Sequence, residues 1–175
     1  MDYSSERLFD HRDTRIFRFR AWVMFAVPLL AILCQVYLRL FFDFFKYLDL
    51  PLLVTIYLAM MRRSPSGGLL VGAVMGLAQD SLMTNPLGMY GICKTLVGYF
   101  AASIGLKIDA EQPLIRIFVT YMFFLFHQFL YWVLQRALLA QTVLFEMRRQ
   151  LLMALLNAII GVILFQLLDK LRDRT

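Results

Sequence analysis

The chain has 175 residues, of which 61% are hydrophobic and 17% charged, and its formal net charge is +6. A soluble domain is typically about half apolar and about a quarter charged, so this composition excludes an ordinary water-soluble fold and predicts a chain that faces lipid. In a soluble protein, this positive charge would suggest binding to nucleic acid. In a membrane protein, it indicates cytoplasmic loops rich in Lys and Arg that are attracted to anionic lipid.

The first twenty residues mix five arginines with acidic residues, so they are too long and too mixed in charge for the start of a signal peptide. No small-residue cleavage site follows the first apolar block. We therefore predict that residues 1–20 form a cytoplasmic segment, with an interfacial helix as one candidate form. Residues 21–40 are interpreted as an uncleaved first span.

Six apolar blocks follow one another along the chain. A helix needs about 20 residues, within a range of about 17–25, to cross the hydrocarbon of a bilayer. The second and third blocks are short, so five spans with one re-entrant segment are the alternative topology. We predict an all-α integral membrane fold, a bundle of six transmembrane helices, with a cytoplasmic tail over residues 169–175. The predicted spans are about 21–40, 44–61, 67–83, 89–106, 114–135 and 151–168.

The distribution of lysine and arginine predicts the orientation. With six spans, twelve of these residues fall on the side of the two termini and five on the opposite side, while Lys94 lies inside a span. Cytoplasmic loops are enriched in Lys and Arg, so both termini are expected in the cytoplasm. On the outer side, residues 136–150 alternate apolar and charged side chains, which predicts an amphipathic helix along the interface.

The third block carries Gly68, Gly72, Gly76 and Asp80 at a spacing of four residues. This spacing places them on one face of a helix, where the glycines allow another helix to approach closely. A carboxylate at membrane depth needs a partner or a polar cavity. Alternatively, Asp80 caps the helix at the membrane surface, because the turn-forming residues 84–88, which include Pro86 and Gly88, follow directly.

The fourth block places Lys94 on a face of small residues rather than on a face of large apolar ones. One hypothesis is an intramembrane ion pair with Asp80 across the short turn, since opposite charges stabilise each other at low dielectric. The alternative is that Lys94 extends its ammonium group outward to the nearby surface. The small residues that share its helix face include Gly91, Gly98 and Gly105.

Two polar side chains mark the last two spans. His127 is a candidate for proton relay or metal binding, but a hydrogen bond between helices is the commoner role and the one we expect. Asn157 lies one turn before Gly161 and indicates another packing contact.

An aromatic cluster lies at the outer edge of the first two spans. It consists of four phenylalanines that we expect to face lipid, with contact to a partner helix or a periplasmic segment as the alternative. These residues are Phe41, Phe42, Phe44 and Phe45.

Catalytic motifs are not found in the sequence. It has no phosphate-binding glycine loop and neither HExxH nor CxxC spacing. An intramembrane aspartyl protease needs two carboxylates at depth, and only Asp80 qualifies. We therefore expect no enzyme activity, no cofactor and no metal.

The run from Gly68 to Asp80, then Pro86-Leu-Gly88, then Lys94 to Tyr99, resembles the bacterial rod shape-determining protein family MreD. That family has a glycine-rich span ending in G-x-x-x-D, a short turn with a late glycine, and a following span with a Gly/Ala-Tyr pair. The resemblance implies a non-catalytic inner-membrane subunit of the cell-elongation machinery. It implies MreC as the direct partner, and MreB, RodA and the transpeptidase as direct or indirect ones.

The resemblance also implies a six-helix fold similar to the substrate-binding (S) subunits of energy-coupling-factor vitamin transporters. A small-molecule carrier is therefore the alternative function. A carrier needs a pocket with several convergent polar groups. The predicted outer helix ends offer few, namely Thr84, Asn85 and Gln135. This favours a scaffold over a carrier.

Overall fold

The computed structural model describes residues 21–83, 86–108, 112–140 and 143–171. The predicted interfacial helix over residues 1–20, two residues of the 84–88 turn and most of the C-terminal tail lie outside this part. The described residues form six α-helices, one short 3-10 helix and no strand, which confirms the all-α prediction. The helices are α1 (Ala21–Phe41), η2 (Asp43–Lys46), α2 (Leu50–Arg62), α3 (Pro65–Leu82), α4 (Met89–Gly105), α5 (Pro113–Leu139) and α6 (Met147–Asp169).

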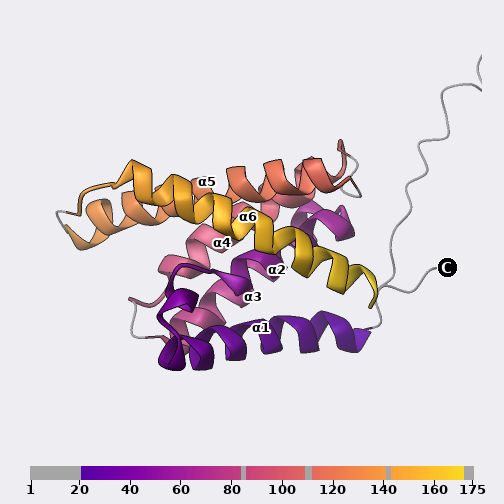
Figure 1. Ribbon diagram of the computed structural model, residues 1–175, viewed down its shortest axis with the longest axis horizontal. Coiled ribbons are helices and arrows are strands. Elements are labelled where there is room, and N and C mark those ends of the chain that lie inside the picture. Colours follow the sequence, from indigo (N-terminus) through magenta and orange to yellow (C-terminus); the bar gives the residue numbers. More distant parts are fainter. Residues whose placement is uncertain (1–20, 84–85, 109–111, 141–142, 172–175) are drawn as a thin grey trace, which may run out of the picture.

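The bundle places α1 on one side, α5 and α6 on the opposite side, and α2, α3 and α4 between them (Figure 1). The start of α1 and the end of α6 lie at the same end of the bundle, which we call the termini end. The opposite end, which we call the cluster end, holds η2, the start of α4 and the start of α6 (Figure 1). Successive helices run in opposite directions, as short connections require.

Helix α2 lies at the centre of the core. Every residue from Pro51 to Met61 is buried, and the helix packs against α1, α3, α4, α5 and α6. A helix that is apolar all round is buried on all sides, as α2 is here. Its 13 residues span about 20 Å, less than the hydrocarbon thickness of about 30 Å.

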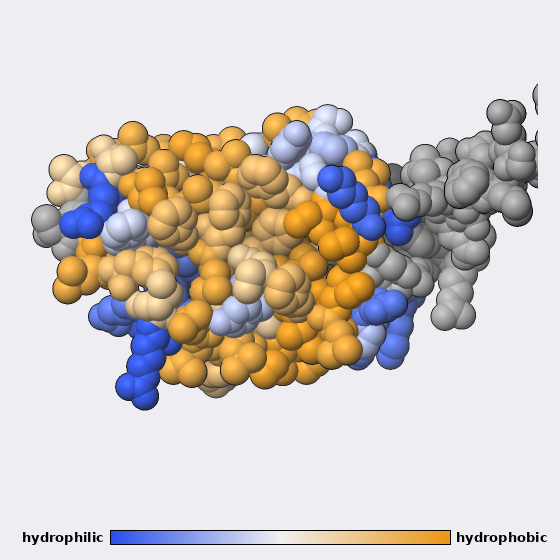
Figure 2. Space-filling model, turned by 90° about the horizontal axis from the view of Figure 1, so that it is seen from above, coloured by the Kyte–Doolittle hydropathy of each residue, from blue (hydrophilic) through white to orange (hydrophobic). Residues whose placement is uncertain are grey.

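Among the helices of the described residues, α1, α5 and α6 are long and apolar enough to cross a membrane. Large hydrophobic side chains such as Phe25, Leu70 and Phe118 are exposed on the surface. Figure 2 shows that hydrophobic residues cover most of the middle of one face, while hydrophilic residues gather toward its two ends. This is the surface of a membrane protein, whose polar groups belong at the two water interfaces.

Some element boundaries differ from the sequence-based ones. Helix α2 begins at Leu50 rather than at residue 44, because η2 occupies residues 43–46 and Asp49 then caps α2. The predicted amphipathic helix over residues 136–150 is wrong. Helix α5 continues to Leu139 and α6 begins at Met147, so these two helices take most of that segment.

Candidate functional site

An ion pair lies buried at the cluster end. The Lys94 Nζ donates a hydrogen bond to the Asp49 Oδ1 at 2.6 Å, with Lys94 fully buried and Asp49 13% exposed. Asp49 also caps α2, because its Oδ1 accepts the backbone N–H of Leu52 at 3.0 Å. The Lys94 Nζ lies 5.6 Å from the centre of the Tyr90 ring. One carboxylate oxygen therefore ties the start of α2 to the second turn of α4.

The hypothesis that Lys94 pairs with Asp80 is therefore wrong, and so is the alternative that Lys94 reaches the surface. Asp80 instead accepts backbone N–H groups from Gly88 at 3.0 Å, Tyr90 at 3.2 Å and Gly91 at 3.0 Å. The first N–H groups of a helix have no partner within it and carry a partial positive charge. The Asp80 carboxylate, which is 1% exposed, thus caps α4 from the end of α3.

This capping predicts a large effect of Asp80→Ala. The change leaves three N–H groups at the start of α4 without their acceptor, and we expect the free energy of unfolding to fall by about 2–4 kcal/mol. Asp80→Asn keeps an acceptor oxygen and should lose less. Thermal unfolding of the purified protein in detergent measures both.

The neighbouring variant Ser81→Ala is the control, since the Ser81 hydroxyl is exposed and, among the described residues, donates only to the carbonyl oxygen of Leu77 in its own helix turn. An Asp80→Ala protein as stable as the Ser81→Ala protein would contradict the capping role.

The glycine face of α3 packs directly on the backbone of α4. A Cβ added at Gly68, Gly72 or Gly76 would overlap the carbonyl oxygen of Gly98, Lys94 or Tyr90, respectively. On α4 itself, a Cβ at Gly98 would overlap the carbonyl oxygen of Gly68, and one at Gly91 would meet the Leu77 side chain at 2.9 Å. Gly105 packs on another helix, where its Cβ would lie 2.5 Å from the carbonyl oxygen of Met60 in α2.

The turn over residues 47–49 is held by α1. The Gln35 side chain, 1% exposed, donates from Nε2 to the carbonyl oxygen of Leu48 at 2.7 Å and of Phe45 at 3.1 Å. Its Oε1 accepts the backbone N–H of Leu50 at 3.0 Å. All of the side chain's polar atoms are therefore used to fix the chain just before α2.

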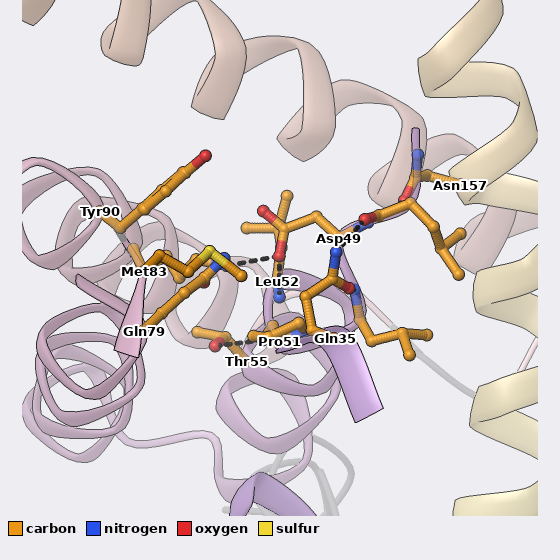
Figure 3. A network of polar contacts seen from close by, with 12 residues as sticks. Gln35, Asp49, Pro51, Leu52, Thr55, Gln79, Met83, Tyr90 and Asn157 are labelled. Carbon is orange, nitrogen blue, oxygen red and sulfur yellow. Dashed lines mark hydrogen bonds and ion pairs between the residues drawn. The ribbon is translucent and has the colours of Figure 1, made fainter. Parts of the chain in front are cut away.

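The same turn is held from the other side by α6. The Asn157 Oδ1 accepts the backbone N–H of Asp49 at 3.0 Å, and its Nδ2 donates to the carbonyl oxygens of Tyr47 at 2.8 Å and Met153 at 2.9 Å. Figure 3 shows Asp49 with Asn157 on one side and with Gln79 and Tyr90 on the other. Asn157 is thus more than a packing contact, because it joins α6 to the residue that pairs with Lys94.

A small polar cavity of about 40 Å³ lies beside this network. Among its lining residues are Gln35, Arg39, Asp49 and Gln79. The Arg39 Nε and the Gln79 Oε1 are buried and have no hydrogen-bond partner among the described residues. A cavity of this size with a free donor and a free acceptor suits one ordered water molecule. We call Gln35, Asp49, Lys94 and Asn157, together with this cavity, the polar cluster.

The family of the chain follows from its sequence match. The family model described as rod shape-determining protein MreD matches residues 16–172, which covers all six α-helices and the polar cluster. The chain belongs to the MreD family. It is therefore a rod shape-determining membrane protein of a family that is generally non-catalytic and structural. No curated protein and no solved structure matches the chain.

His127 of this MreD-family chain does not form the expected interhelical hydrogen bond. It is 1% exposed, and neither ring nitrogen has a partner among the described residues. Its ring instead stacks on Tyr90 at 5.7 Å between centroids, and Tyr90 stacks on Tyr131 at 4.9 Å. Across the described part of the chain, no three His, Cys, Asp or Glu side chains gather where a metal ion could be held.

The MreD aromatic cluster lies around η2 at the cluster end. Phe41, Phe42 and Phe44 are exposed, whereas Phe45 is half-buried and packs against the core.

Within η2, Lys46 donates a hydrogen bond to Asp43 and holds the pKa of that exposed carboxyl below its usual value.

A second ion pair, which the sequence-based reasoning missed, lies at the termini end. The Arg116 guanidinium donates to the Asp169 Oδ2 at 2.7 Å, and the Tyr57 hydroxyl donates to the Asp169 Oδ1 at 2.9 Å. These contacts join α2, α5 and α6. The role of Asp49 was missed as well, although an aspartate two residues before Pro51 is a recognisable helix-start signal.

Proposed function

We propose that this chain is a non-catalytic scaffold subunit of the bacterial cell-elongation machinery in the inner membrane. It binds MreC directly, and it acts directly or indirectly with MreB, RodA and the transpeptidase in cell shape and peptidoglycan synthesis. The observation that carries this proposal is the MreD family match over residues 16–172. The internal use of the buried polar groups supports a structural role, because most of them bind other parts of the same chain.

The proposed topology has six spans with both termini in the cytoplasm. It is supported by the position of the start of α1 and the end of α6 at one end of the bundle (Figure 1), and by the excess of Lys and Arg in segments assigned to that side. The shorter helix α2 is compatible with this topology because other helices surround it. The bilayer then contacts α1, α5 and α6 most extensively.

A small-molecule carrier with the fold of a vitamin-transporter S subunit is the alternative proposal. Small-molecule sites usually enclose about 300–1,000 Å³ with several polar groups. The polar cavity beside the polar cluster has only about 40 Å³, and the groove of about 650 Å³ beside the start of α6 is open at the surface and does not enclose a ligand. A larger cavity of about 680 Å³ between α4 and α5 is lined, within the described part of the chain, by apolar side chains only, such as Ile104, Phe118 and Phe126. The scaffold proposal is therefore the better supported of the two.

The exposed aromatics Phe41, Phe42 and Phe44 are a proposed partner surface of the scaffold, with lipid as the alternative neighbour. Their position at the cluster end would place them at the periplasmic interface in the proposed topology, close to the periplasmic part of MreC.

Depletion of the protein in its native host tests the proposed function. Cells that lose the protein should change from rods to rounded cells, and the wild-type gene supplied in trans should restore the rod shape. A variant with a disrupted α3–α4 contact should not restore it. Rod-shaped growth that continues without the protein would contradict the proposal.

A further inference from the structure

An open groove of about 650 Å³ lies at the cluster end, beside the start of α6. Its lining combines two arginines and a tyrosine with an apolar floor. We propose that this groove binds one anionic phospholipid, with the phosphate at the arginines and an acyl chain along α6. The lining includes Tyr47, Arg148, Arg149, Leu152, Met153 and Leu156.

The charge at the mouth of the groove favours an anion. Two guanidinium groups, those of Arg148 and Arg149, face one carboxylate, that of Glu146. The Arg149–Glu146 contact is 3.8 Å long and both side chains are more than half exposed, so it is a weak ion pair. Arg148 has no ion-pair partner in the part of the chain that the structure describes. Guanidinium groups bind phosphate oxygens through paired hydrogen bonds, so a phosphate satisfies this excess of positive charge.

The floor of the groove favours a lipid over a free phosphate ion. Arg149, Met153 and Leu156 follow at spacings of four and three residues, which places them on one face of α6. This face runs about 10 Å from the charged end toward the middle of the bundle. One continuous surface thus changes from cationic to apolar along the direction in which a lipid changes from headgroup to acyl chain.

The wall opposite α6 is preformed. The Arg149 guanidinium lies 5.8 Å from the centre of the Tyr47 ring. The carbonyl oxygen of Tyr47 accepts a hydrogen bond from Asn157, so the polar cluster fixes this wall of the groove. A tyrosine at a membrane interface commonly lies at the level of the lipid headgroups. The lipid therefore finds both sides of its site in place before it binds.

Native mass spectrometry of the purified protein in mild detergent tests the inference. The probes are phosphatidylglycerol and phosphatidylcholine with the same acyl chains. We expect the protein to retain phosphatidylglycerol in preference to phosphatidylcholine. In the double variant Arg148→Gln/Arg149→Gln, we expect binding of phosphatidylglycerol to weaken about tenfold or more.

The matched control is Arg136→Gln, which removes an arginine that lies over the Trp132 ring and outside the groove. This control should bind phosphatidylglycerol as the wild type does. The variant Arg148→Lys/Arg149→Lys keeps both charges and should retain most of the binding, while size-exclusion chromatography verifies that each variant is folded.

Three results would overturn the inference: equal retention of the two lipids, equal losses in the Gln double variant and the Arg136→Gln control, or capture of a protein instead of the lipid by a photo-crosslinker at position 152. The inference rests on the membrane location and not on MreC binding. Recovery of MreC by the Gln double variant is measured in parallel. This measurement separates a failure of the lipid site from a failure of the scaffold proposal.

Discussion

Replacement of Lys94 by alanine is expected to lower the free energy of unfolding by about 3–5 kcal/mol. The change removes the ammonium group that lies 2.6 Å from the Asp49 carboxylate and leaves that carboxylate largely buried without its charged partner. The loss should appear as a lower unfolding temperature in detergent and as less protein in the membrane. Lys46→Ala is the control, because Lys46 forms an exposed pair with Asp43, and exposed pairs contribute little.

A double-mutant cycle identifies the partner of Lys94. The structure predicts strong coupling between Lys94→Ala and Asp49→Asn, since both remove the charge attraction between the same two groups, and near-additive effects for Lys94→Ala with Asp80→Asn. Asparagine at position 49 keeps the helix-capping oxygen, so the cycle isolates the charge interaction. Coupling to Asp80 and additivity with Asp49 would mean that the pairing is wrong.

Gly72→Leu is expected to disrupt the contact between α3 and α4. A Cβ at this position overlaps the carbonyl oxygen of Lys94, which is a backbone atom and cannot rotate away as a side chain can. Overpacking of a core commonly costs about 1–3 kcal/mol, and we expect at least about 3 kcal/mol here because two helix backbones must separate. The displaced segment of α4 carries Lys94, so the ion pair with Asp49 is expected to weaken as well.

The control for this change is Val74→Leu, two residues along the same helix. Val74 is 65% exposed, so an added methylene there should leave stability within about 0.5 kcal/mol of the wild type. Unfolding curves of both variants and their ability to restore rod shape measure the difference. Similar stability of the Gly72→Leu and Val74→Leu proteins would contradict the close approach of α3 and α4.

Sequence reasoning predicts those parts of the fold that local patterns determine. Long apolar blocks mark α1, α5 and α6, and the four-residue spacing from Gly68 to Asp80 marks the face of α3 that meets α4. The start of α2 is not determined in this way. Aromatic residues continue from the end of α1 through η2, so hydrophobicity alone does not show that the helix begins only after Asp49.

The polar cluster depends on contacts between distant parts of the chain. Lys94 and Asp49 are 45 residues apart, and Asn157 meets Asp49 from 108 residues away. The sequence shows that a buried lysine needs an anionic partner, but the nearer carboxylate, Asp80, is occupied by the start of α4. For His127, the sequence pattern predicts a hydrogen bond between helices. In the structure, the His127 ring instead stacks on the Tyr90 ring.

In this bundle, most of the buried polar groups hold one part of the chain to another. The few residues that precede α2 form hydrogen bonds with side chains from three other helices, namely Gln35, Lys94 and Asn157. A fixed arrangement of helices can present the same outer surface to a partner at all times, which is what the proposed scaffold requires.

The most direct test of the proposed scaffold function is a pull-down of the tagged protein from its native host in mild detergent, with mass spectrometry of the bound chains. We expect recovery of MreC in an amount comparable to that of the tagged protein. We expect no MreC in a pull-down with an unrelated multi-pass protein of equal abundance. Recovery of a transporter ATPase pair without MreC would contradict the scaffold and support the carrier.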